Sequence, residues 1–140
     1  MKVDIYIRVE SKGNPRGHGK GAAIVEFVKR NGTEVTRVVC VEVKNDTRNA
    51  LYLMAINAAL KILTKPCEVT VHCCNTLISS AVKNKWLVHW SENGWKKSDG
   101  ETPANLEEWK KLHILSNMHK ISWTVESKKY KEDLDEALRF

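Results

Sequence analysis

A change of hydrophobic period near Thr47 constrains the fold of this chain more than any other feature. Before that point, residues 2–9 place apolar side chains at every second position, which predicts a half-buried strand. Residues 22–30 and 33–43 form two further predicted strands, and Asn31-Gly32 between them is a strong signal for a two-residue hairpin. The first 43 residues therefore predict an antiparallel meander of three strands.

From Thr47 onward, segments of helical period alternate with short apolar runs. A strand that follows a helix usually pairs in parallel with an earlier strand, so residues 67–73 are expected beside residues 2–9. The pattern predicts a single α/β domain over residues 1–140, with a five-stranded mixed sheet flanked by helices. The remaining predicted elements are a helix from Thr47 that ends before Pro66, helices at 75–90, 106–118 (with Asn105 as N-cap) and 130–139, and a strand at 119–125.

Composition excludes several function classes. The chain has 140 residues, of which 42% are hydrophobic, which is typical of a folded domain and excludes wholesale disorder. No apolar run approaches the roughly 18 residues of a membrane span, and the N-terminus reads as a strand rather than a secretory signal. A cytoplasmic protein without a membrane partner is therefore expected. The 23 basic and 17 acidic residues leave a net charge of +6, which favours a polyanionic partner.

The cysteines predict neither a disulfide nor a metal centre. Cys67, Cys73 and Cys74 lie close in sequence to His72, but their spacing fits no zinc finger or knuckle. Neighbouring residues of a strand also point to opposite faces of a sheet. We expect these thiols, with Cys40, to be small buried hydrophobic side chains in a reducing compartment.

A glycine-rich segment, residues 11–21, predicts a loop between the first two strands. Its ionisable residues are all basic or histidine, and it contains no carboxylate. Two interpretations stay open, a solvated surface or a binding site for anions. The residues concerned are Lys12, Arg16, His18 and Lys20.

Several collinear motifs resemble one known family. They include Gly13-Asn14-Pro15 after the first strand, residues 47–60 as a first helix, and the tryptophan-rich stretch 86–96. Asn105-Leu106 and residues 119–123 continue the same order. With these motifs the chain resembles the bacterial-type (type 1) ribonucleases H, which implies the ribonuclease-H-like fold. In that fold Trp86, Trp90 and Trp95 are expected to pack in a helical handle rather than to stack on bases.

The resemblance also implies a chemistry, hydrolysis of the RNA strand of an RNA–DNA hybrid by two divalent metals. Such a site needs several carboxylates that converge on two ions. At the four family positions this sequence has Arg8, Tyr52, Cys74 and Asp135, so only the last retains a carboxylate. Arginine repels a cation and a thiol is a soft ligand, so we expect no metal and no cofactor here. Glu10 is a candidate displaced acid, with His72 and Asp135, and Mg²⁺ or Mn²⁺ is expected only if activity survives.

We therefore predict a catalytically degenerate ribonuclease-H-like domain that binds nucleic acid, an RNA–DNA hybrid or a duplex, by its backbone and minor-groove shape. One alternative is a structural or assembly module that contacts a protein partner, similar to the connection domains of reverse transcriptases. Another is a residually active, metal-dependent ribonuclease H. The residues expected to contact nucleic acid are Arg8, Lys12, Asn14, Arg16, Arg48 and Asn49.

Overall fold

The computed structural model describes residues 1–13 and 16–139, and Asn14 of the predicted interface lies outside the described residues. Its elements, in chain order, confirm the predicted alternation of strands and helices. They are β1 (Lys2–Ser11), β2 (Arg16–Val28), β3 (Glu34–Thr47), α1 (Arg48–Lys61), β4 (Glu68–His72), α2 (Thr76–Lys83), α3 (Trp86–Glu92), α4 (Leu106–Met118), β5 (Lys120–Thr124) and α5 (Lys131–Ala137).

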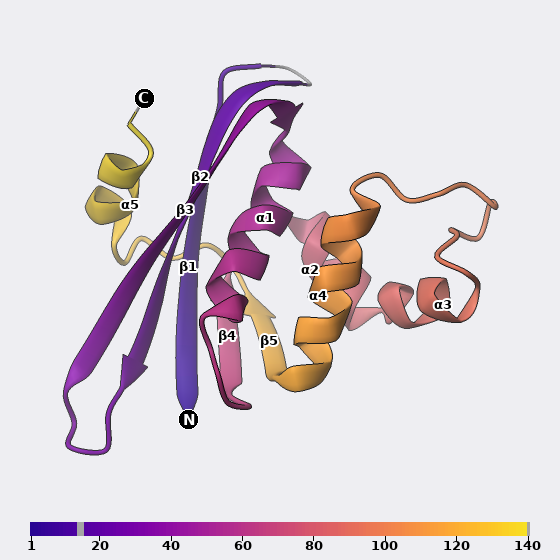
Figure 1. The fold of residues 1–140 in the computed structure, drawn as a ribbon. Helices are drawn as coiled ribbons and strands as arrows, with labels where there is room; N and C mark the ends of the chain where they lie inside the picture. Colours follow the sequence, from indigo (N-terminus) through magenta and orange to yellow (C-terminus); the bar gives the residue numbers. More distant parts are fainter. Residues whose placement is uncertain (14–15, 140) are drawn as a thin grey trace.

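The five strands form one mixed sheet in the order β3-β2-β1-β4-β5. β1, β2 and β3 pair antiparallel, whereas β4 pairs in parallel with β1 and with β5, as the crossover through α1 predicts. Helix α1 lies against one face of the sheet with α4 outside it, and α5 lies alone on the other face (Figure 1). The structure thus confirms the predicted α/β class. None of the helices in the described residues is long and apolar enough to cross a bilayer.

Helix α1 is the centre of the larger hydrophobic core. Thr47 accepts a hydrogen bond from the backbone N–H of Ala50 (3.2 Å), which caps the first turn. Most of the helix is buried, because the sheet covers one side and α4 covers the other. On the opposite face of the sheet, a smaller core joins Tyr6, Ala22 and Ile24 to Leu134 and Leu138 of the C-terminal helix region.

Leu112 gives a measurable test of this packing. Its side chain is fully buried where α4 meets the core around α1. Truncation removes buried methyl groups and leaves a cavity, so Leu112→Ala is expected to lower the free energy of unfolding by about 2–5 kcal/mol. Urea titration followed by circular dichroism measures this change. Ile114→Ala on the exposed side of the same helix is the control, with an expected change below about 0.5 kcal/mol.

The glycine-rich segment is not the loop that the sequence predicts. β2 already begins at Arg16, so most of the segment is strand, with a register shift between Gly17 and Gly19. The glycines instead allow α1 to approach the sheet closely. A Cβ atom on Gly19 would lie 2.4 Å from Cδ1 of Leu51, and one on Gly21 would lie 3.3 Å from Cβ of Ala55.

Three local predictions also need correction. The turn at Asn31-Gly32 is longer than two residues, because the last ladder pair is Val28 with Glu34. The predicted helix 75–90 is two helices, α2 and α3, since Lys85 adopts a left-handed conformation (φ 59°). Asn105 precedes α4 as predicted, but it has a φ of 63° and its side chain makes no capping hydrogen bond.

The cysteine prediction is right for two residues and wrong for two. Cys67 and Cys73 are buried, whereas Cys40 and Cys74 are exposed. All four are free thiols. Cys74 is exposed because it follows the end of β4, where the chain leaves the sheet.

The predicted packing role of the handle tryptophans is confirmed for Trp86 and Trp90. Both are partly buried against the larger core, and the Trp90 ring meets Trp109 of α4 edge-on with centroids 5.5 Å apart. Trp95 lies edge-on to His113, at 5.6 Å between ring centroids. The handle is therefore attached to α4 by aromatic contacts.

Candidate functional site at the end of the sheet

The structure brings Arg8 and Asp135 together. Arg8 lies near the end of β1, on the face that α5 covers, and its Nε is 3.1 Å from Oδ1 of Asp135. Lys131, one turn earlier in α5, places its Nζ 2.8 Å from the other carboxylate oxygen. The hydrogen bond from Lys131 and the charge of Arg8 hold the pKa of Asp135 below its ordinary value. Both carboxylate oxygens of Asp135 are thus bound by cationic side chains.

The other two positions named from the resemblance, Tyr52 and Cys74, also contact each other. The phenol oxygen of Tyr52, in α1, is 3.1 Å from Sγ of Cys74. Tyr52 is only 5% exposed, and its burial, with the bond to Cys74, raises its pKa well above the ordinary value. The phenol therefore stays neutral and protonated at physiological pH. Burial also raises the pKa of the neighbouring Cys73 to about 11, so Cys73 is a thiol.

The two pairs lie at the same end of the sheet. β1 and β4 run in parallel, and their last paired positions are Tyr6 and His72. Arg8 and Cys74 each follow two residues beyond that pair. The carboxyl ends of neighbouring parallel strands are where ligands bind in many α/β sheets. The four positions named from the resemblance therefore lie at one end of the sheet, and this end is the candidate site.

The donor set of this site does not fit two hard divalent cations. It offers one carboxylate, which two cations already bind, with a phenol, a thiol and a guanidinium. Glu10, the candidate displaced acid, is exposed and pairs across the sheet with Lys20. In the part of the chain that the structure describes, no three histidine, cysteine or acidic side chains gather in a metal-binding group.

His72 contacts a different carboxylate from the one expected. Its Nε2 is 2.9 Å from Oδ1 of Asp4, and its ring stacks on Tyr6 with centroids 4.4 Å apart. These partners lie further back along β1, away from the strand end. The suggested grouping of His72 with Glu10 and Asp135 is therefore not formed.

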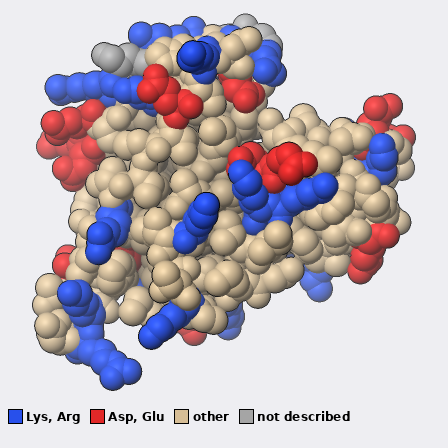
Figure 2. Space-filling model, viewed as in Figure 1, with Lys and Arg blue, Asp and Glu red and all other residues tan. Residues whose placement is uncertain are grey.

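Basic side chains surround the same end of the sheet. Arg16, the first residue of β2, pairs in the ladder with Thr47, and Arg48 follows as the first residue of α1. The Arg48 guanidinium lies 5.9 Å from the centre of the Tyr52 ring. Lys12 is exposed just beyond β1. Figure 2 shows Lys and Arg gathered with acidic side chains at this upper end of the molecule.

The basic segment is partly neutralised by β3, which sequence analysis missed. Nη2 of Arg16 donates to the carbonyl of Asn45 (3.0 Å) and lies 3.7 Å from Asp46, and His18 is 2.7 Å from Glu42. The sequence held a signal for these contacts. A β2 strand that continues through the glycines pairs Arg16 with Thr47, the neighbour of Asp46, and pairs Glu42 with Lys20, two residues from His18. The charge of Arg16 is thus paired with an acid of β3, and His18 is hydrogen-bonded to another.

Asn49 of the predicted interface is held by a second asparagine. Its Oδ1 accepts a hydrogen bond of 2.8 Å from Nδ2 of Asn75, while Oδ1 of Asn75 caps α2 by accepting from Ile78 N–H. The two amides link the start of α1 to the start of α2. Asn75 is a positioning residue that sequence reasoning did not single out.

Glu26 fixes the segment that carries Asp135. This buried carboxylate on β2 accepts hydrogen bonds from the Tyr130 hydroxyl and from Lys129 Nζ, the latter at 2.8 Å. Burial raises the pKa of Glu26, but the hydrogen bonds from Lys129 and Tyr130 outweigh burial and leave the pKa below 4.5. Tyr130 also packs edge-on against Tyr6 at 5.3 Å. These contacts hold the entry to α5 on the sheet.

Removal of this carboxylate charge is expected to destabilise the protein in a pH-dependent way. Because the folded-state pKa of Glu26 is depressed, its contribution is present at neutral pH and is lost as pH falls below 4.5. At pH 7, Glu26→Gln is expected to lower the free energy of unfolding by about 1.5–3 kcal/mol. The difference from the native protein should shrink below pH 4.5 in urea titrations. An equal difference at all pH values, or an equal effect of Glu136→Gln on the exposed side of α5, would contradict this role.

Comparison with known proteins places the chain in a family. The family model described as RNase H matches residues 2–126. The chain belongs to the RNase H family. A ribonuclease H of Lachnoclostridium phytofermentans is 34% identical to this RNase H domain over 123 residues, which are 88% of the chain and 78% of the relative. The resemblance that the motifs indicate is thus confirmed.

Solved structures confirm the fold of this RNase H domain. The crystal structure of LC9-RNase H1, a type 1 RNase H with the type 2 active-site motif, superposes with a TM-score of 0.79 and 22% identity, over 98% of this chain and 70% of that one. The foamy viral protease-reverse transcriptase in complex with an RNA/DNA hybrid superposes with a TM-score of 0.68 and 12% identity, over 98% of this chain and 19% of its own.

Proposed function

We propose that this RNase H domain is catalytically degenerate and binds nucleic-acid duplexes, with an RNA–DNA hybrid as the main ligand. The observation that carries the proposal is the ion pair between Arg8 and Asp135 at 3.1 Å, where the family resemblance calls for two carboxylates. A guanidinium at this place repels a divalent cation and satisfies the remaining acid. The pair Tyr52 and Cys74 adds only neutral or soft donors.

The same substitution supports binding of a phosphate. The Arg8 side chain is 31% exposed, and its contact with Asp135 is a surface ion pair that costs little to break. A guanidinium can bind two phosphate oxygens at once, so Arg8 can exchange the carboxylate for a backbone phosphate. In this proposal Arg8, near the carboxyl end of β1, binds a phosphate of the nucleic-acid backbone directly.

Further cations extend this contact along the duplex. Arg16 and Arg48 lie side by side at the start of β2 and α1, and Lys12 lies beyond the end of β1. Asn49 offers an amide to the minor groove, where 2′-hydroxyl groups distinguish RNA from DNA. One structural relative was solved with an RNA/DNA hybrid, which supports the choice of ligand. Such contacts read backbone and shape rather than base sequence.

An active ribonuclease H is the second candidate, because curated relatives at about one-third identity carry that name. Activity would require the chain's own residues to hold divalent ions. Asp135 would have to leave both Arg8 and Lys131, and among the described residues no group of three histidine, cysteine or acidic side chains could hold a metal ion. The donor chemistry of the site therefore favours binding without hydrolysis.

Fluorescence anisotropy with three labelled duplexes tests the proposal. RNA–DNA hybrid, duplex DNA and duplex RNA are titrated with the native protein at about 50 mM and about 200 mM salt. We expect a micromolar Kd for the hybrid at the lower salt concentration. At the higher salt concentration the affinity should be about tenfold lower or weaker still, because the protein releases counterions when it binds phosphates. Absence of binding to all three duplexes at the lower salt concentration would refute the proposal and favour the assembly module.

A further inference from the structure

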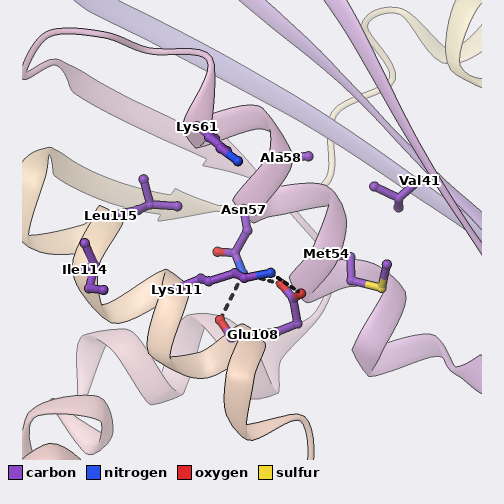
Figure 3. A pocket seen from close by; sticks show the side chains of 9 residues that line it. All are labelled: Val41, Met54, Asn57, Ala58, Lys61, Glu108, Lys111, Ile114 and Leu115. Atoms are coloured by element: carbon purple, nitrogen blue, oxygen red, sulfur yellow. Dashed lines mark hydrogen bonds and ion pairs between the residues drawn. The ribbon is translucent and has the colours of Figure 1, made fainter.

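Two apolar hollows lie away from the candidate site, and they differ in charge balance. The first, about 430 Å³, lies between α1, α4 and β3 (Figure 3). The acidic residue that lines it, Glu108, is already bound. Asn57 donates to the carbonyl and to Oε2 of Glu108 at 2.9 and 2.8 Å, and Lys111 contacts Oε1 at 3.1 Å. The carboxylate of Glu108 is therefore paired within the protein, and Asn57 Oδ1 is the buried polar atom of this pocket that makes no hydrogen bond among the described residues.

The second hollow is a larger groove at the opposite end of the sheet from Arg8. It has a volume of about 720 Å³ and lies between the segment after α1 and the ends of β2 and β3. Phe27 and Leu63 form part of its apolar wall, and both are partly buried against the core. Ile62 and Val38, which also line it, are 39% and 57% exposed. Apolar side chains therefore remain in contact with water along the groove.

The charges around this groove are of one sign. Arg37 and Lys65 line it, and no carboxylate does so among the described residues. Neither side chain makes a hydrogen bond or an ion pair with any residue in the described ranges 1–13 and 16–139. Two such cations beside exposed apolar groups match a ligand that combines apolar side chains with carboxylates.

The groove is also bordered by an unpaired strand edge. β3 is the outermost strand of the sheet, and it contributes Arg37, Val38 and Val39 to the lining. The outer edge of such a strand presents backbone groups to which an extended chain can hydrogen-bond. A polypeptide segment therefore fits this groove better than a compact small molecule does.

We propose that the groove between β3 and the end of α1 binds an acidic, apolar peptide segment of a partner protein. Apolar side chains of the segment would fill the space beside Phe27, Ile62 and Leu63, and its carboxylates would pair with Arg37 and Lys65. This surface is at the far end of the sheet from the proposed nucleic-acid contacts. The domain can then bind a partner protein and a duplex at the same time.

Two synthetic peptides test the chemical class directly by NMR. The probe is acetyl-Asp-Asp-Leu-Ala-Phe-amide, and the control is the same peptide with lysines in place of the aspartates. We expect the acidic peptide to shift the backbone amide signals of Arg37, Ile62 and Leu63, with a Kd between about 10 µM and 1 mM. The basic peptide should cause no such shifts. Equal shifts with both peptides, or none with the acidic peptide at about 2 mM, would overturn the proposal.

Charge reversal separates the groove from general electrostatics. Arg37→Glu with Lys65→Glu is expected to weaken acidic-peptide binding by at least about tenfold, because the peptide carboxylates then face like charges. Lys83→Glu with Lys128→Glu makes the same charge change at exposed positions outside the groove and should leave the Kd unchanged. All four substituted positions are exposed, so we expect the variants to fold, and their NMR spectra check this. Dimerisation of the native chain in sedimentation, abolished by Arg37→Glu with Lys65→Glu, would assign the groove to a second copy and contradict the proposal.

Discussion

A variant that carries Arg8→Asp, Tyr52→Glu and Cys74→Asp is expected to bind Mn²⁺ at least about 100-fold more tightly than the native chain. The triple change places three carboxylates beside Asp135 and removes the guanidinium that binds it. Each change alone should have little effect, since several oxygen ligands must act together to hold the ions. Isothermal titration calorimetry with MnCl₂ measures the difference.

A matched control has the same added charge elsewhere. Lys83→Asp, Val88→Glu and Ile114→Asp make the same total charge change at exposed positions on α2, α3 and α4. This control should bind Mn²⁺ no better than the native protein. If the folded triple variant also fails to gain affinity, the assignment of Arg8, Tyr52 and Cys74 to the family's metal positions is wrong.

Arg16→Glu with Arg48→Glu is expected to weaken binding of the RNA–DNA hybrid by about 100-fold at about 50 mM salt. Each substitution removes a charge-assisted bond to a phosphate and adds repulsion. The slope of log K against log salt should also become shallower, by roughly 0.7–0.9 for each phosphate that the protein no longer neutralises. Anisotropy titrations over a series of salt concentrations measure both quantities.

The control for this prediction reverses two charges at the far end of the sheet. Lys2 begins β1 and Lys61 ends α1, so Lys2→Glu with Lys61→Glu gives the same net charge away from the proposed interface. It should reduce affinity much less than the test variant. Equal reductions in the two variants would show that net charge alone governs binding, and the proposed interface would be rejected.

The fold could be predicted from the sequence because hydrophobic period and family motifs agree. Apolar residues recur at every second position of β1, as burial of one face of a strand requires. Apolar residues occupy several sides of α1, because most of this helix is buried. The glycines of residues 16–21 misled the prediction, because they permit close packing with α1 rather than a turn. Composition alone does not distinguish these two uses of glycine.

The candidate site was only partly predictable. The family motifs predicted that Arg8, Tyr52, Cys74 and Asp135 belong to one site, and this assignment stays a prediction. The contacts Arg8–Asp135 and Tyr52–Cys74 could not be predicted from the motifs. Those contacts depend on how α5 docks onto the sheet, which long-range packing decides. Lys131, four residues before Asp135 in a helix, is the partner that sequence spacing could have indicated.

Neutralisation of the basic segment by β3 shows why local charge is a poor guide. Within residues 11–21 no acid is present, yet Arg16 and His18 find Asp46 and Glu42 across the hairpin. These partners are distant in sequence and become neighbours only through strand register. A count of charges along the sequence therefore overstates the positive potential at this end of the sheet.

The most direct test of a degenerate site is a cleavage assay with the native protein. A labelled RNA–DNA hybrid is incubated with excess protein in Mg²⁺ and, separately, in Mn²⁺, with Asp135→Asn as the paired control. The proposal of a degenerate site predicts intact RNA in every reaction, at the same level with native protein and with the variant. RNA cleavage that requires the divalent ion and disappears with Asp135→Asn would contradict the account.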